Sequence, residues 1–356
     1  MCRRRGRTIR SAAWLAVLMG IGIGPSAAQA QEARVPEGGE LPPYARVMPV
    51  PPGPGPVSRF TPVRNGLPTI MLTGYWPPTN EMLRQFSPNP VQNPDGWVGQ
   101  NWEGRGYNVY AFFPEFPGGL GKGEGDFEVD YQDTSNDFWP LVATLEPIAI
   151  VSFGRAGADI DWELEGGNYR YTTTSYSADY LTPYRPTPEL PFYNEPVNTF
   201  RVSTLPLAQI VAAVAACGAN VNPYSTTYDE SKFLCSYMGY HSNWYHELHA
   251  DPEDPAWNIC AGFIHLGSNL TLPDAILCSE VTLRTVIGHV DLQRPVPGDL
   301  DADRDVDYDD LTVLTDCLAG PQGAPGAGCT GADFDDDDDV DLADFAAFQK
   351  WFTGSS

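Results

Sequence analysis

The sequence predicts an α/β fold, a three-layer α/β/α sandwich on a mostly parallel sheet, followed by a small all-α module. Short apolar runs alternate with helical segments between residues 67 and 293, which is typical of helices packed on both faces of a parallel sheet. A Pro/Gly boundary at 294–298 ends this alternation. Beyond it, an aspartate-rich loop followed by a short apolar segment occurs twice within 299–356, which indicates an internal repeat.

The predicted strands are short apolar runs at 69–73, 107–113, 148–153 and 259–266. The run at 148–153 is rich in β-branched residues, so we expect it at the centre of the sheet. The predicted helices span 138–145, 207–217, 232–249 and 275–292. Gly218 ends the second of these helices. In sheets of this kind, functional sites gather at the carboxyl ends of the strands.

The amino terminus predicts export. A cluster of arginines precedes an apolar stretch at 12–23, and Ala28-Gln29-Ala30 fits the small-x-small rule for signal cleavage. Residues 1–30 are therefore interpreted as a signal peptide, which predicts a periplasmic or extracellular, cell-surface location. The apolar stretch is too short for a membrane span, so none is expected after cleavage. Residues 31–66 are rich in proline and glycine and predict a linker or arm.

The formal net charge is −25, and its placement matters more than its size. The segment 299–344 holds sixteen aspartates and one basic residue, so the remainder of the chain is only mildly acidic. This balance argues against a nucleic-acid partner. Cys317 and Cys329 lie close enough in sequence for a local disulfide, whereas Cys217, Cys235, Cys260 and Cys278 lack the CxxC spacing of a structural zinc site.

The aspartate-rich repeats have the pattern of calcium-binding loops. Calcium takes six to eight oxygen ligands, and a twelve-residue EF-hand loop supplies them from fixed positions. The same register occurs in both repeats, whereas a disordered acidic tail would not repeat it. Loop position 6, which favours glycine, is Arg304 in one repeat and Asp338 in the other. The expected Ca²⁺ ligands are Asp299, Asp301, Asp303, Asp305, Asp307, Asp310, Asp333, Asp335, Asp337, Asp339, Asp341 and Asp344.

Four segments of the α/β region carry groups suited to nucleophilic catalysis. A Gly/Ala-rich stretch after the central strand leads to Glu163 and Asn168, and Thr204-Leu205-Pro206 precedes a helix. Phe233-Leu234-Cys235 stands at the expected start of another helix, and Gly262 to His265 lies near a strand end. A helix amino terminus and a nearby imidazole both activate a thiol, and a carboxylate can orient the imidazole.

Taken in this order, the four segments resemble the pyroglutamyl peptidase I family of cysteine peptidases over residues 68 to 292. The resemblance implies a triad of Cys235, His265 and Glu163, with Glu165 as a nearby competitor for the carboxylate. It also implies that Tyr75, Phe233 and Asn168 bind substrate and that catalysis needs no cofactor. The sequence departs from the family at Pro78, which stands where a second phenylalanine is usual, and at Ser236, where asparagine is usual.

The repeats at 299–356 resemble a dockerin type I pair, which implies structural calcium and a protein or cell-surface partner. The leading interpretation is an exported cysteine peptidase that removes an N-terminal pyroglutamyl or related blocked residue from peptides. The alternative is a catalytically inactive, peptide-binding member of the same fold, tethered through its tail. A serine or metal hydrolase is disfavoured because G-x-S-x-G and HExxH motifs are absent.

Overall fold

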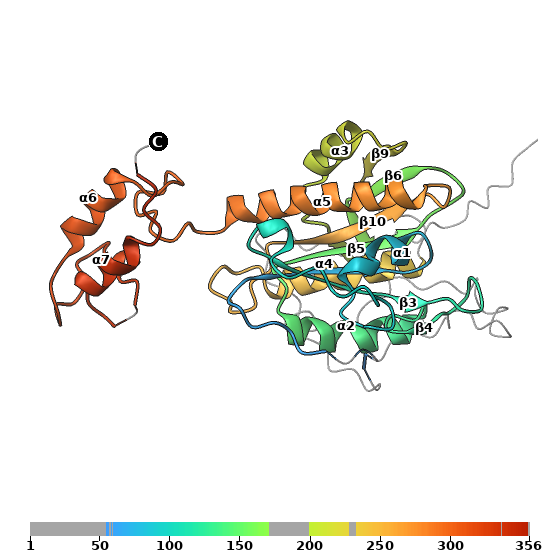
Figure 1. Cartoon of the computed structure of the whole chain (residues 1–356), viewed down its shortest axis with the longest axis horizontal. Coiled ribbons are helices and arrows are strands. Elements are labelled where there is room, and N and C mark those ends of the chain that lie inside the picture. The colour runs from blue at the N-terminus through green and yellow to red at the C-terminus, as the bar shows by residue number, and fades with distance from the viewer. Residues whose placement is uncertain are drawn as a thin grey trace, which may run out of the picture. The chain divides into compact units, whose positions relative to one another are not determined.

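A six-stranded sheet with helices on both faces forms the α/β part of the computed structural model (Figure 1). The structure describes residues 55–56, 58, 60–170, 199–227, 233–335 and 337–354. The predicted signal peptide and most of the predicted arm lie outside the described residues. Within the described part of the chain, no helix combines the length and apolar character needed to cross a membrane.

The sheet is mostly parallel, as predicted. Its strand order is β2-β1-β5-β10-β6-β9. The first four strands in this order run parallel, and β6 is antiparallel to β10 and parallel to the edge strand β9. The strands are β1 Thr69–Gly74, β2 Asn108–Phe112, β5 Ala149–Arg155, β6 Asp161–Glu165, β9 Asn222–Thr226 and β10 Cys260–Leu266. The stretch at 161–165 is thus a strand, although it is not among the strands predicted from the sequence.

Two hydrophobic cores, one on each face of the sheet, complete three layers (Figure 1). One face packs against α1, α3 and α5, and the other packs against α2 and α4. Within β5, Val151 and Phe153 point to the first core and Ile150 to the second, as the alternation of a strand requires. The helices are α1 Thr79–Leu83, α2 Tyr131–Leu145, α3 Leu207–Ala216, α4 Leu234–Leu248 and α5 Leu272–Gln293.

Two helices, α2 and α5, begin earlier than predicted, and a capping residue marks each start. Asp130 caps α2 by accepting a hydrogen bond from the Gln132 backbone N–H, so this helix begins before residue 138. Thr271 caps α5 in the same way by accepting from the Asp274 N–H, so this helix begins at Leu272, three residues before the predicted start. Both caps are polar residues that precede the apolar pattern, and the hydrophobic periodicity alone did not mark them.

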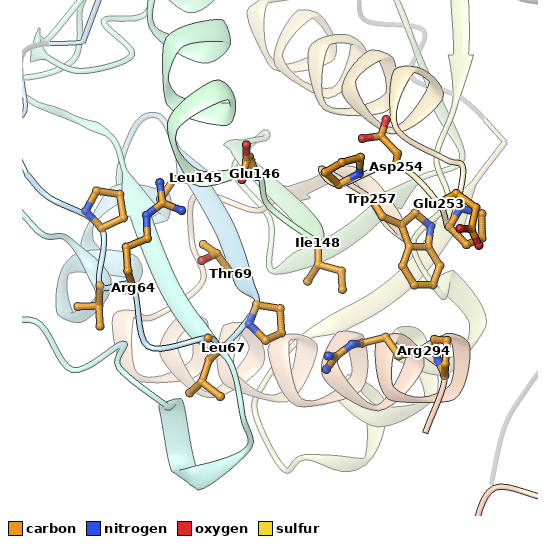
Figure 2. Close-up of a pocket in the computed structure, with 17 residues that line it drawn as sticks. Arg64, Leu67, Thr69, Leu145, Glu146, Ile148, Glu253, Asp254, Trp257 and Arg294 are labelled. Atoms are coloured by element: carbon orange, nitrogen blue, oxygen red, sulfur yellow. The ribbon is translucent and has the colours of Figure 1, made fainter. Parts of the chain in front are cut away.

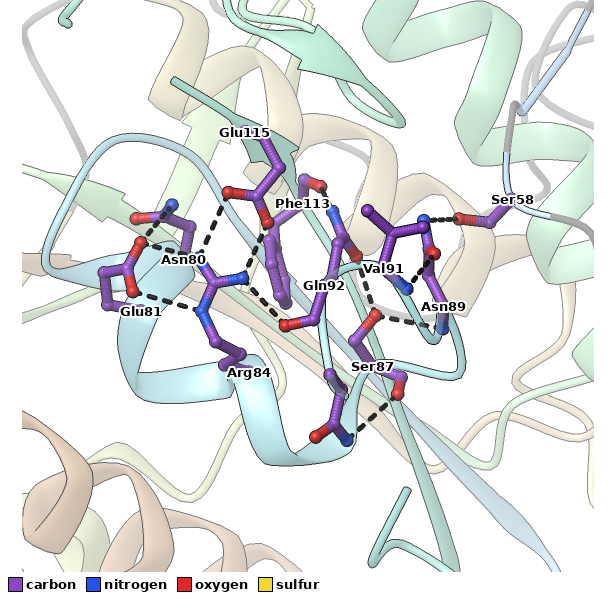
Figure 3. A network of polar contacts seen from close by, with 11 residues as sticks. Ser58, Asn80, Glu81, Arg84, Ser87, Asn89, Val91, Gln92, Phe113 and Glu115 are labelled. Carbon is purple, nitrogen blue, oxygen red and sulfur yellow. Dashed lines mark hydrogen bonds and ion pairs between the residues drawn. The ribbon is translucent and has the colours of Figure 1, made fainter. Parts of the chain in front are cut away.

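A polar network fixes α1 and the turn that follows it (Figure 3). The Arg84 guanidinium pairs with Glu81 at 2.7 Å and with Glu115 of the short strand β3 (Pro114–Glu115) at 2.7 Å. It also donates to the Gln92 carbonyl oxygen at 2.8 Å. These contacts anchor α1, whose first residue, Thr79, accepts a hydrogen bond at Oγ1 from the Tyr75 backbone N–H at 2.8 Å. The remaining described strands form two small antiparallel pairs. One pair is β3 with β4 (Glu124–Gly125), and the other is β7 (Gly167–Tyr169) with β8 (Phe200–Val202).

The acidic repeats fold into two short helices, α6 Tyr308–Cys317 and α7 Leu342–Phe348. Each begins with a capping box, formed by Asp307 with Asp310 in α6 and by the equivalent aspartates in α7. The position-8 valines, Val306 and Val340, are buried in a small core of their own. The Cys317–Cys329 disulfide predicted from the sequence is present.

Candidate active site

Cys235 is the second residue of α4, directly above the end of the central strand. Phe233 is the N-cap of α4 and supplies no side-chain cap, so the first backbone N–H groups precede the helical hydrogen-bond ladder. These N–H groups and the helix dipole favour negative charge at this position. The thiol is nearly enclosed, because Cys235 is 4% exposed.

Gly154, near the carboxyl end of β5, lies directly against the Cys235 thiol. A Cβ atom at residue 154 would lie 2.8 Å from Cys235 Sγ and 2.5 Å from the Phe263 ring. No side chain larger than hydrogen fits there without moving the nucleophile or the strand. The glycine of the Gly/Ala-rich stretch is therefore required by the close approach of α4 to the sheet.

His265 lies on the neighbouring strand β10 and bridges the thiol to a carboxylate. Its imidazole is in hydrogen-bond contact with Cys235, and its Nδ1 lies 2.5 Å from Glu165 Oε1. Burial alone would lower the pKa of His265, but the Glu165 carboxylate and the Cys235 sulfur outweigh it and raise this pKa well above 6.5. The ring therefore favours the imidazolium form, which places a positive charge beside the sulfur.

The carboxylate in contact with the imidazole is Glu165, which corrects the expectation for Glu163. Strand β6 pairs Glu163 with His265 and Glu165 with Phe263, so both carboxylates point to the same face as the ring. Glu165 is fully buried and reaches the ring diagonally. Glu163 lies instead beside Tyr224, where the two carboxylates Glu163 and Asp161 hydrogen-bond the phenol, whose pKa is raised mainly by burial.

Two buried asparagines, Asn168 and Asn243, form a hydrogen-bonded chain to Glu165. Asn168 donates from Nδ2 to Glu165 Oε2, and its Oδ1 accepts from Asn243 Nδ2 of α4 at 3.1 Å. Gly239 makes this possible, because a Cβ atom there would lie 2.4 Å from Asn168 Oδ1. Asn168 is fully buried. Asn168 thus contacts Glu165 and Asn243, and its contact with substrate stays a prediction.

Tyr75 and Phe233 are the two aromatic residues expected to bind substrate. Tyr75 is fully buried, its hydroxyl lies 2.6 Å from Thr134 Oγ1, and it is close enough to Cys235 to interact electrostatically. Phe233 is 39% exposed at the start of α4. Of these two expected substrate residues, Phe233 is the one that presents apolar surface to solvent. The long segment that follows Arg170 lies outside the described residues.

The Thr-Leu-Pro motif has a structural task at the base of β10. Thr204 N–H donates to the Ala261 carbonyl at 2.9 Å, and the Ala261 N–H donates to Thr204 Oγ1 at 2.9 Å. The motif therefore fixes the strand that carries His265. Of the residues that support the site, sequence reasoning named Glu165 only as a competitor and missed Gly239 and Asn243, whose roles depend on contacts between α4 and β7.

One cavity lies away from the thiol. It measures about 740 Å³ and is lined by residues near the amino ends of β1 and β5, among them Arg64, Glu146 and Arg294 (Figure 2). A second cavity of about 430 Å³ lies at the opposite edge of the sheet and is lined by Pro77, Pro78 and Arg155, among others. This second cavity shares the carboxyl edge of β1 and β5 with the candidate site.

The acidic repeats bring carboxylates together in four groups, within each of which oxygens lie within 4.8 Å of one another. These groups contain eleven of the twelve aspartates expected to bind calcium, and the residues are Asp299, Asp301 and Asp303; Asp305, Asp307 and Asp310; Asp333, Asp335 and Asp344; and Asp339, Asp341 and Asp344. Asp337 is not in these groups. As expected, the position-6 residues Arg304 and Asp338 have φ values of 80° and 65°.

Comparison with solved structures finds pyroglutamyl peptidases. Pyroglutamyl peptidase I from Bacillus amyloliquefaciens matches at 14% identity with a TM-score of 0.43, covering 63% of this chain and 97% of that chain. Pyrrolidone carboxyl peptidase from Thermococcus litoralis matches at 14% identity with a TM-score of 0.43, covering 64% and 97%. The Pyrococcus furiosus enzyme matches at 13% identity with a TM-score of 0.42, covering 62% and 99%. No protein-family model and no curated protein matches the chain.

Proposed function

We propose that this chain is a cysteine peptidase that removes an N-terminal pyroglutamyl, or related blocked, residue from peptides. The observation that carries the proposal is the continuous contact from Cys235 through His265 to Glu165 at the carboxyl ends of β5 and β10 and the adjoining strand β6. A thiol at a helix start, an imidazole and an orienting carboxylate are the groups that acyl transfer requires.

In this mechanism, the Cys235 sulfur attacks the carbonyl carbon of the blocked residue. Backbone N–H groups at the start of α4 stabilise the oxyanion, and the His265 imidazolium protonates the leaving amine. The neutral imidazole then takes a proton from water, which attacks the acyl-enzyme and releases the acid. Glu165 keeps Nδ1 of His265 protonated, so that its other ring nitrogen serves the reaction.

The choice of substrate rests on the sequence resemblance and on the surroundings of the thiol. Tyr75 and Phe233 provide aromatic groups beside Cys235, which suits a flat, uncharged lactam ring. Pro78 stands where the family has a second phenylalanine, so we expect a broader choice among blocked termini than the family shows.

A fluorogenic amide of pyroglutamate, assayed under reducing conditions with calcium, tests this proposal. We expect turnover by the wild type, a loss of at least about 10³-fold in Cys235→Ala, and retained activity in the matched control Cys260→Ala. Cys260 is buried in the other core and does not contact the candidate site. Acetylated, formylated and free glutamyl amides define the specificity.

Failure of the wild type to turn over every substrate of this panel would refute the peptidase. If a fluorescent pyroglutamyl peptide still bound the protein, the alternative of a non-catalytic, peptide-binding member would hold. The absence of both turnover and binding would refute both interpretations.

We also propose that the two acidic loops bind calcium, that the pair serves as a dockerin-like anchor to a protein or cell-surface partner, and that the chain is exported. Support for calcium comes from the carboxylate groups and from the shared register of the loops. Titration calorimetry with Ca²⁺ should give two sites, and Asp310→Asn or Asp344→Asn should each remove one. Asp309→Asn, an exposed neighbour outside the carboxylate groups, is the matched control. Binding unchanged in both variants would contradict the assignment.

A further inference from the structure

Four described cysteines have no disulfide bond, and two of them, Cys217 after α3 and Cys278 in α5, are in contact. We propose that Cys217 and Cys278 form a disulfide that fastens the α3–β9 edge of the fold to α5. The chain already carries one disulfide, Cys317–Cys329. A compartment that oxidises that pair exposes the remaining thiols to the same oxidant. The proposal does not depend on Cys235 being catalytic.

The two helices place the thiols in contact. α3 and α5 pack side by side on the same face of the sheet (Figure 1). Cys217 is the C-cap of α3, and Cys278 lies in α5, fully buried in the core against which Cys217 packs. Their side chains are hydrogen-bonded to each other. Gly218, with φ of 89°, follows immediately and ends the helix.

Exposure assigns a role to each sulfur in bond formation. Cys217 is partly exposed, so its thiolate can attack a small disulfide such as oxidised glutathione and form a mixed disulfide, releasing one glutathione thiol. Cys278, which is in contact with Cys217, then loses its thiol proton and attacks the Cys217 sulfur, and this releases the second glutathione thiol. Two protein thiols lose two electrons and two protons, and one glutathione disulfide becomes two thiols.

The remaining two cysteines are poor competitors for this bridge. Cys260 is fully buried in β10, and the thiol that contacts the partly exposed Cys217 is that of Cys278. Cys235 is held against His265 on the other face of the sheet. The bridge therefore forms without consuming the candidate nucleophile.

The bridge would act on the strand that bears Glu165. Ile210 and Val214 are the fully buried residues of α3, and Leu207 and Val211 pack partly buried against the same core. The chain continues from Cys217 into β9, which pairs with β6 and aligns Thr226 with Glu165. Fixing Cys217 to α5 thus holds the outer neighbour of β6 and steadies the carboxylate that contacts His265.

Disulfide mapping by mass spectrometry tests the proposal on the wild-type full chain. The protein is equilibrated in a glutathione redox buffer, alkylated without reduction under denaturing conditions and digested. We expect a cross-linked peptide pair containing Cys217 and Cys278, with Cys235 and Cys260 alkylated. The Cys317–Cys329 bridge is the internal control for oxidation. Alkylation of both Cys217 and Cys278 in a sample where the control bridge has formed would overturn the proposal, as would a bridge to Cys235.

A melting experiment measures the consequence. In a Cys317→Ala/Cys329→Ala background, oxidation should raise Tm by on the order of 10 °C, because the bridge closes a loop of about 60 residues. Adding Cys217→Ala should abolish this redox dependence. Equal Tm values in oxidising and reducing buffer before that addition would contradict a bridge that secures the fold.

Discussion

Replacing Glu165 by glutamine tests the arrangement of the candidate site most directly. Glu165 has two acceptor oxygens: Oε1 faces the His265 Nδ1–H, and Oε2 accepts from Asn168 Nδ2. A glutamine offers one oxygen and one NH₂ group. In either orientation of the glutamine amide, its NH₂ group must face a donor, either His265 Nδ1–H or Asn168 Nδ2. The change therefore removes the negative charge from the imidazolium and also breaks one buried contact.

The expected loss is about 10³-fold in kcat/KM, which corresponds to about 4 kcal/mol of transition-state stabilisation. This magnitude follows from the role of a triad carboxylate, whose replacement by its amide costs up to about 10⁴-fold through the wrong imidazole tautomer. Glu163→Gln is the matched control. It alters a carboxylate on the same strand and face, beside Tyr224, and we expect a change of less than about threefold.

The assay compares both variants with the wild type on the pyroglutamyl amide, with circular dichroism and Tm to verify folding. A pH profile separates orientation from stability, because loss of the Glu165 charge should lower the pKa of the His265 imidazole. If Glu163→Gln lost more activity than Glu165→Gln, the assignment of Glu165 to the imidazole would be refuted, and the original interpretation of Glu163 would be restored.

Three further predictions follow from single residues. Gly154→Ala should reduce activity by at least about 10²-fold, since its Cβ would lie 2.8 Å from Cys235 Sγ, whereas Gly288→Ala, with open space around it in α5, should keep activity and raise Tm slightly. Burial raises the pKa of Asp137 to about 8 in the folded protein, whereas in the unfolded chain it loses its proton near pH 3.8. The free energy of unfolding, measured with urea, should therefore fall between these two pH values by up to about 1.4 kcal/mol per pH unit. Asp137→Asn should flatten this slope. Asp338→Gly should stabilise the acidic repeats by about 1 kcal/mol in thermal unfolding, because Asp338 has φ of 65°; a destabilised variant would show that its side chain matters more than its backbone.

The order of the predicted strands and helices along the chain could be read from the sequence because the apolar runs are the segments that the fold buries as strands. The run that forms β5 is apolar on both faces of the sheet, so its central position was evident from β-branched residues alone. The helix starts were less accurate, because Asp130 and Thr271 act through polar caps. Strands β6 and β9 were missed. β6 alternates acidic residues with Trp162 and Leu164, and its acidic side faces a buried site rather than solvent.

The candidate nucleophile and base could be predicted because each stands at an element end with a recognisable local signature. The carboxylate could not be chosen with equal success, because Glu163 and Glu165 differ by one strand period and point the same way. The support from Asn243 depends on a helix that packs over β7, and no local pattern in the sequence carries that information.

The pairing of β6 with β10 gives the turn between β5 and β6 an unexpected importance. If that turn were two residues longer or shorter, β6 would shift by one full strand period along β10. Trp162 and Leu164 would still face the apolar core, so the sheet would tolerate the shift. A different acidic residue, or none, would then meet His265. The length of this connection, together with its hydrogen bonds to residues 267–269, sets the register that brings Glu165 to the imidazole.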